Sequence, residues 1–180
     1  MKKAVTFISL MLLSGCAEMS KLKISDDGRY IFQNSSLSVE APKECILDMF
    51  VYGTESSVTF TTGRGYWMAS GVYALHNFRL PNDVSDTDDF HVESEKVYKK
   101  VVKDNNRTII ETKTLNISGQ DAYQGVSTDN NEDYQVHTHI YMPNKSIALA
   151  VLKYPLKNLE GKDTEIPWNC YNRFINSISF

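Results

Sequence analysis

The sequence predicts an α+β domain in which a mainly antiparallel sheet is covered by two helices, at about residues 88–104 and 167–178. Three observations favour this fold class. Short strand-like segments occur in two runs, a helix-like segment separates the runs, and a second helix-like segment closes the chain. Strands that occur in runs, rather than alternating one by one with helices, are typical of antiparallel sheets. No repeat or linker interrupts residues 28–180, which we therefore expect to form one domain.

The first 15 residues have the pattern of a signal peptide that is removed before folding. Two lysines precede a run of ten mainly apolar residues, 4–13. This run is too short to span a bilayer, which needs about 20 residues, and has the length of a secretory signal. It ends in LSGC at 13–16, which resembles the lipobox of bacterial lipoproteins at every position. The resemblance implies cleavage before Cys16 and attachment of lipid to the Cys16 thiol.

The lipobox resemblance also implies a location. Loss of the two lysines changes the formal charge from -3 to -5, and residues 16–27 become a polar, lipidated tether. The residue after Cys16 is Ala17, whereas aspartate there favours inner-membrane retention in lipoproteins of the enterobacterial type. We therefore expect an exported protein held at the outer membrane, facing the periplasm. The acidic balance argues against a nucleic-acid partner, because lysine and arginine dominate binding to phosphates.

Two cysteines remain once Cys16 is assigned to lipid. In an oxidising compartment two such cysteines usually pair, so we predict a disulfide between Cys45 and Cys170. It would tie an early strand to the C-terminal helix. Two buried free thiols are the alternative.

The first run of strands occupies the segment before residue 80. Alternating or continuous apolar residues bounded by glycine, proline or polar turns predict these strands. They are residues 29–33, 37–40, 45–52 and 57–61, followed by an interrupted strand at 66–80.

The first helix is predicted from Asp88 to about Asp104. Phe90, Val97 and Val101 recur at helical spacing, acidic residues begin the segment and lysines crowd its end, which complements the helix dipole. The second run of strands follows, at residues 108–117, 122–127, 134–142 and 146–154, the last two forming a hairpin.

The closing helix begins at Pro167. Cys170, Phe174 and Ile178 follow one another at steps of four, which places them on one face of the helix. We expect this face to turn toward the sheet, where Cys170 can meet Cys45.

Three segments of the mature chain resemble the PsbP/Mog1/DcrB-like fold. They are ISGQDAYQGV at 117–126, IALAVLKY at 147–154 and CYNRFINSISF at 170–180. The resemblance implies a small domain that closes with a helix and a short final strand. It also implies an accessory or adapter role rather than a catalytic one.

Two groups of side chains are candidates for a site. His137 and His139 lie about 7 Å apart on one face of their strand and would begin a zinc site if His76 or His91 supplied a third ligand. A solvated polar face of the hairpin is the favoured interpretation. The aromatic residues Tyr66, Trp67 and Tyr73 would form a surface for stacking a small ligand or glycan.

The chain carries no motif of a known catalytic class. The GxSxG, HExxH and SxxK patterns are absent, so we predict no enzyme activity, no cofactor and no metal. The predicted function is a non-catalytic interaction or assembly module with an envelope protein partner. A ligand- or glycan-binding protein is the first alternative, and a hydrolase with dispersed catalytic residues is the second.

Overall fold

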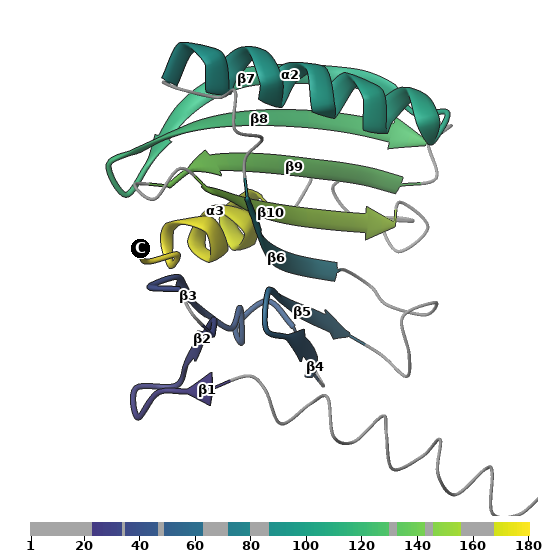
Figure 1. The fold of residues 1–180 in the computed structure, drawn as a ribbon. Coiled ribbons are helices and arrows are strands. Elements are labelled where there is room, and N and C mark those ends of the chain that lie inside the picture. Colours follow the sequence, from purple (N-terminus) through teal and green to yellow (C-terminus); the bar gives the residue numbers. More distant parts are fainter. Residues whose placement is uncertain are drawn as a thin grey trace, which may run out of the picture.

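The computed structural model confirms the α+β class and the mainly antiparallel sheet (Figure 1). It describes residues 23–33, 35–46, 49–62, 72–79, 87–129, 133–142, 146–155 and 168–180. Seven strands form the main sheet in the order β4-β5-β6-β10-β9-β8-β7, and β1-β2-β3 form a small second sheet. The seven strands are β4 (Met49–Thr54), β5 (Ser57–Thr62), β6 (Val72–Arg79), β7 (Thr108–Ile117), β8 (Gln120–Asp129), β9 (Asp133–Tyr141) and β10 (Ser146–Pro155).

The two predicted helices lie on opposite faces of the main sheet. Helix α2 (Thr87–Asp104) contacts β7, β8 and β9 on one face. Helix α3 (Trp168–Asn176) packs on the other face, where the Phe174 ring lies 5.6 Å from that of Tyr73 and 6.0 Å from that of Phe60. The small sheet also packs on the α3 side, where the Tyr30 ring lies edge-on to that of Phe60 at 5.0 Å. Its strands are β1 (Lys23–Ile24), β2 (Arg29–Ile31) and β3 (Ser38–Glu40). The main core is therefore between the sheet and α3.

A buried polar network crosses this core. The Tyr171 hydroxyl donates to the Ala150 carbonyl at 3.1 Å and lies 2.8 Å from the Thr138 hydroxyl. The Gln124 amide donates to the same Thr138 hydroxyl at 2.8 Å. Buried polar groups are costly unless they are hydrogen-bonded, so these contacts fix the position of α3 against β8, β9 and β10.

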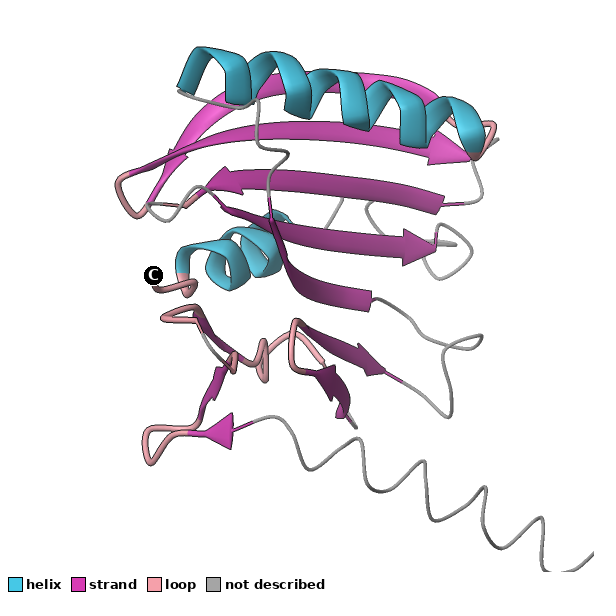
Figure 2. Cartoon of the chain, viewed as in Figure 1, coloured by secondary structure: helices cyan, strands magenta, loops and turns pink. Residues whose placement is uncertain are grey.

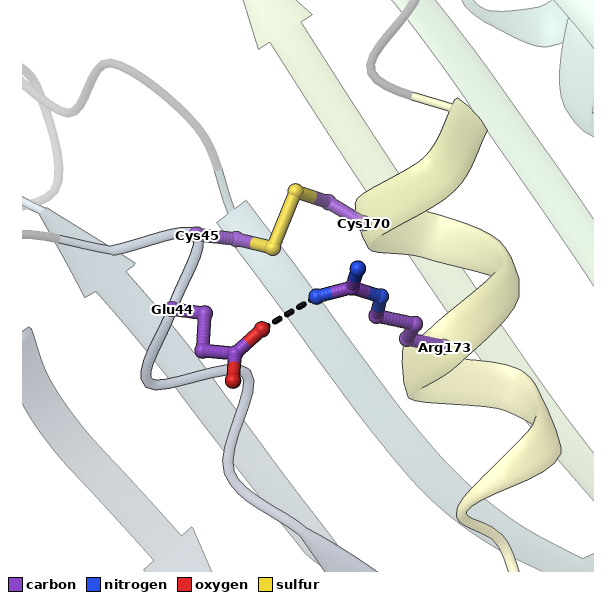
Figure 3. The surroundings of a disulfide bond; sticks show 4 residues. All are labelled: Glu44, Cys45, Cys170 and Arg173. Carbon is purple, nitrogen blue, oxygen red and sulfur yellow. Dashed lines mark hydrogen bonds and ion pairs between the residues drawn. A yellow bond between two sulfur atoms is a disulfide. The ribbon is translucent and has the colours of Figure 1, made fainter.

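The disulfide joins Cys45 and Cys170 across the α3 side of the molecule, with their Cα atoms 5.8 Å apart (Figure 3). Cys45 lies in a turn before β4, so the prediction that it belongs to a strand is wrong. Arg173 forms an ion pair with Glu44 beside the disulfide. The bond connects the chain before β4 with the last helix.

The chain ends against the small sheet. Ser179 forms an antiparallel bridge with Ser38, with amide-to-carbonyl distances of 2.9 Å in both directions. Arg29 donates to the Ser177 carbonyl at 2.5 Å. The terminal extended segment that the fold resemblance implied is therefore present.

Two boundaries differ from the sequence prediction. The folded part includes Lys23–Ile24, which pair with β2, although residues 16–27 were expected to be tether. The predicted strand at 66–80 is β6 from Val72 onward, and its earlier part lies outside the described residues. Among the described helices, none has the length and apolar character required to cross a membrane.

Candidate functional surface

The face of the main sheet that carries α2 is covered over only part of its width (Figure 2). Residues paired across neighbouring strands project to the same face. The register places Phe78 beside Ile147, and His76 beside Leu149, on this face. Beyond α2, no described helix or strand packs on β10, β6, β5 and β4 there. On this face Thr61, Val72 and Ala74 are nevertheless buried, whereas residues nearer its margins are exposed. We call this area the open face.

The open face is aromatic and aliphatic. The register pairs Tyr52 with Thr59 and Thr59 with Ala74, which places Phe50 and Tyr52 of β4 on the same face as His76 and Phe78. Phe50, Tyr52 and Phe78 are 44%, 46% and 50% exposed, and the Phe78 ring stacks on that of His76 with centroids 5.7 Å apart. The half-buried side chains on the same face come from β6 and β10: His76, Ile147, Leu149 and Val151. Exposed apolar side chains shared by several strands are typical of a surface that contacts another macromolecule.

The predicted aromatic ligand surface is not formed by Tyr73. This side chain is only 3% exposed and packs against Phe174 in the main core. Burial raises the pKa of Tyr73. Tyr66 and Trp67 lie outside the described residues. The alternation of β6 turns Tyr73 and Leu75 inward, whereas His76 and Phe78 are on the opposite side.

The prediction of a solvated face for His137 and His139 is wrong. These side chains are 8% and 4% exposed, because α2 covers them. Burial lowers the pKa of His137 to about 4, with further lowering by His139, Arg107 and His76. Burial also lowers the pKa of His139 to about 4. The alternation of apolar and polar residues along β9 correctly predicted which side chains share a face. It carries no information about whether a helix covers that face.

The histidines do not form a metal centre in the part of the chain that the structure describes. All the histidines of the protein lie on the α2 side: His76 on β6, His91 on α2, and His137 and His139 on β9. His76 is separated from His139 by β10, since both pair with Leu149. No described group of three or more His, Cys, Asp or Glu residues is arranged to hold a metal ion.

Tyr98 provides an aromatic contact between α2 and the sheet. The Tyr98 ring lies 5.7 Å from that of His137 and 6.1 Å from that of Tyr123. It rests on the Gly125 backbone, where an added Cβ would overlap the ring. Glycine is needed at this position because the helix side chain approaches the strand backbone directly.

The end of α2 is fixed by a C-cap and a buried ion pair. The Arg107 amide donates to the Val102 carbonyl at 2.9 Å and the Asn106 amide to the Lys103 carbonyl at 3.1 Å, which is a Schellman motif with Asn106 at positive φ. The Arg107 guanidinium then reaches the Asp133 carboxylate at 2.5 Å. The side chains of this pair are only 6% and 10% exposed.

A cleft of about 750 Å³ opens beside the disulfide, on the α3 side. Its lining includes Lys43, Glu44, Arg173 and Ser177. A serine nucleophile needs a neighbouring base, but the Ser177 hydroxyl donates to the Phe174 carbonyl at 2.7 Å and the histidines all lie on the α2 side. The cleft therefore contains no serine–histidine pair among the described residues.

Comparison with known proteins identifies the fold. No protein-family model matches the chain, and no curated protein sequence matches it. Among solved structures, the chain is similar to cyanobacterial PsbP (CyanoP) from Synechocystis sp. PCC 6803, with a TM-score of 0.59 and 12% identity over 88% of this chain and 92% of that one. It is also similar to the Saccharomyces cerevisiae Ran-binding protein Mog1p, with a TM-score of 0.51 and 8% identity over 83% and 93% of the two chains. These likenesses establish a PsbP/Mog1-like fold.

Proposed function

We propose that the protein is a lipid-anchored, non-catalytic interaction module of a bacterial envelope, and that it binds a protein partner through the open face. The observation that supports this proposal most directly is the exposure of Phe50, Tyr52 and Phe78 on one face of the main sheet. Aromatic side chains are enriched in the energetic centres of protein interfaces. One protein of similar fold, Mog1p, is described as Ran-binding, which supports a protein as the kind of partner.

The anchor in this proposal is Cys16, at the end of LSGC. A single acyl chain binds a bilayer only weakly, whereas two or three give stable attachment. The proposed location is the periplasmic side of the outer membrane. Seven residue steps separate Cys16 from Lys23, the first residue of β1, so a fully extended tether would span about 25 Å at most. The partner would therefore be a protein close to the membrane surface.

Replacing Cys16 with alanine is expected to abolish lipidation and to leave an uncleaved or mislocalised precursor. Membrane fractionation and intact mass of the full chain measure both effects. A Cys45→Ala/Cys170→Ala variant, which keeps Cys16, is the control for general loss of cysteine. Normal membrane retention of the Cys16→Ala variant would contradict the anchor.

Replacing Phe50, Tyr52 and Phe78 together with serine is expected to reduce partner capture at least tenfold, because truncation of even one hot-spot aromatic side chain costs about 2 kcal/mol. The measurement is crosslinking in intact cells, capture of the tagged lipoprotein and quantitative mass spectrometry, with an unrelated lipoprotein as background.

The matched control is a Val92→Ser/Val97→Ser variant. These valines are 64% and 48% exposed on α2, so the variant also removes exposed apolar surface but leaves the open face intact. We expect it to keep the partner. Unchanged partner capture by the aromatic variant, with folding and membrane retention verified, would rule out the open face as the binding surface.

A further inference from the structure

The interface between α2 and the sheet contains buried polar atoms without hydrogen-bond partners. Within the described residues these include His91 Nδ1 and Ser94 Oγ on α2, and His137 Nε2 and His139 Nδ1 on β9. A buried polar atom that makes no hydrogen bond costs free energy. The closed position of α2 therefore carries a penalty concentrated around the histidines.

The apolar contacts that oppose this penalty are few. Phe90, Tyr98 and Val102 are the buried apolar side chains of α2. Tyr98 and Val102 form a small core cluster with Tyr123, separate from the main core that holds α3. Phe90 packs near one end of the helix, with its ring 5.1 Å from that of Tyr141. Helix α2 contains no cysteine, whereas α3 is tied covalently to the chain before β4 by the Cys45–Cys170 disulfide.

The surroundings of the two buried histidines favour their neutral forms. Besides the effect of burial, the charges of three neighbouring groups lower the pKa of His137. These groups are His139, Arg107 and His76. On α2, Glu95 raises and Lys99 lowers the pKa of Tyr123. Asp133 is engaged by Arg107 at 2.5 Å and by Lys153 at 3.2 Å. Among the titratable and charged groups of the elements around the histidines, those joined to this cluster by a ring contact, an ion pair or an electrostatic effect are His76, His91, Glu95, Tyr98, Lys99, Arg107, Tyr123, Asp133 and Tyr141.

We propose that α2 is an acid-released cover: protonation of His137 and His139 separates the helix from β8 and β9 while the rest of the domain stays folded. A charged imidazole is poorly accommodated in the closed form, because it is buried without a carboxylate partner. In the open form water solvates it. Acid therefore favours opening, and neutral pH favours the closed form.

The size of the effect follows from proton linkage. His137 and His139 have a pKa of about 4 when covered, against 6.5 for a free imidazole. Between pH 7.5 and pH 5 the open form gains protons that the closed form does not. The opening equilibrium constant then rises about 30-fold for each histidine, or about a thousandfold for both.

The ion pair between Arg107 and Asp133 indicates about which end α2 would move. It holds the chain immediately after α2 to Asp133. Asn106, which lies between the end of α2 and Arg107, has a φ of 52°. The helix would therefore swing away about its C-terminal end. Opening uncovers His137 and His139, which lie directly opposite Val151 and Leu149 of the open face.

Acid would thus enlarge the open face toward β9 and β8. The binding role of this larger area rests on the proposed function, whereas the opening itself is measured without any partner. A failure of one idea is therefore distinguishable from a failure of the other.

Hydrogen exchange of the full chain, followed by mass spectrometry from pH 7.5 to pH 5, tests the cover. After correction for the pH dependence of intrinsic exchange, we expect protection of α2 amides to fall at least 30-fold while protection of α3 amides stays high. Loss of protection in both helices at the same pH, or an α2 that stays protected at pH 5, would overturn the proposal.

Two variants separate proton binding from simple loosening. His137→Gln/His139→Gln should remove most of the pH dependence of α2 exchange. Val102→Ala shortens a side chain that is 4% exposed in the same interface, and should increase α2 exchange at every pH without changing its slope. If the double variant does not fold, NMR titration of the wild-type imidazole protons provides the test. Protonation of His137 and His139 with α2 still protected would overturn the proposal.

Discussion

Replacing Cys45 and Cys170 together with alanine is expected to lower the free energy of unfolding by about 4–5 kcal/mol. The disulfide closes a sequence separation of 125 residues, and in the chain-entropy description a loop of about this length is worth nearly 5 kcal/mol. The bond restricts the unfolded chain more than it adds contacts to the folded one. Helix α3 should still pack in the variant, because Tyr171 and Phe174 remain buried in the core.

Denaturant unfolding followed by circular dichroism measures this loss, with the free energy extrapolated to water. The control is Glu44→Ala, which removes the ion pair with Arg173 beside the disulfide (Figure 3). Both side chains of that pair are largely exposed, so its removal should cost less than about 1 kcal/mol. A double cysteine variant within 1 kcal/mol of the wild type would show that the bond has no such role.

Replacing Arg107 with alanine is expected to destabilise the protein by about 3 kcal/mol, because its removal takes away the buried partner of the Asp133 carboxylate and leaves that carboxylate to the half-exposed Lys153. The Arg107 guanidinium contacts the Asp133 carboxylate, and it also donates to Ser127 Oγ at 3.1 Å and to the Ser127 carbonyl at 3.2 Å. Its loss would leave Asp133 with Lys153 at 3.2 Å. It would also release the chain that follows α2.

The same denaturation experiment compares Arg107→Ala with Lys153→Ala. Lys153 reaches the same carboxylate, but its side chain is 46% exposed, so its removal should cost less than about 1 kcal/mol. This pair of variants separates the contribution of a buried charge from that of an exposed one at a single acidic residue. Equal effects of the two substitutions would contradict the assignment.

Much of the fold could be predicted because local patterns determine it. The spacing of apolar residues and the charges at its ends predicted α2 within a residue of its observed bounds, Thr87–Asp104. Turn residues predicted the end of β7 at Ile117, where Ser118 and Gly119 have positive φ. The alternation of β9 separated Val136 and Ile140 from His137 and His139. Each of these features depends on residues close together in the chain.

The candidate surface could not be predicted in the same way. An exposed Phe78 and a buried Tyr73 occur on one strand and both are aromatic, so residue type does not distinguish them. Exposure of Phe50 and Phe78 depends on how far α2 extends across the sheet, which is a long-range property. The alternation of residues 72–79 does indicate which side chains of this strand share a face. It does not indicate which of the two faces is covered.

The sequence by itself determined the order of strands and helices, the α+β class and the two cysteines, Cys45 and Cys170, that can pair. It also carries the lipobox pattern on which the proposed anchor depends. Only the tertiary structure decided that α2 covers the histidines of β9, that Tyr73 belongs to the core and that Phe50, Tyr52 and Phe78 share an exposed face. The physical reason is that propensity, capping and alternation act over a few residues. Burial, by contrast, depends on which distant segment packs against each face.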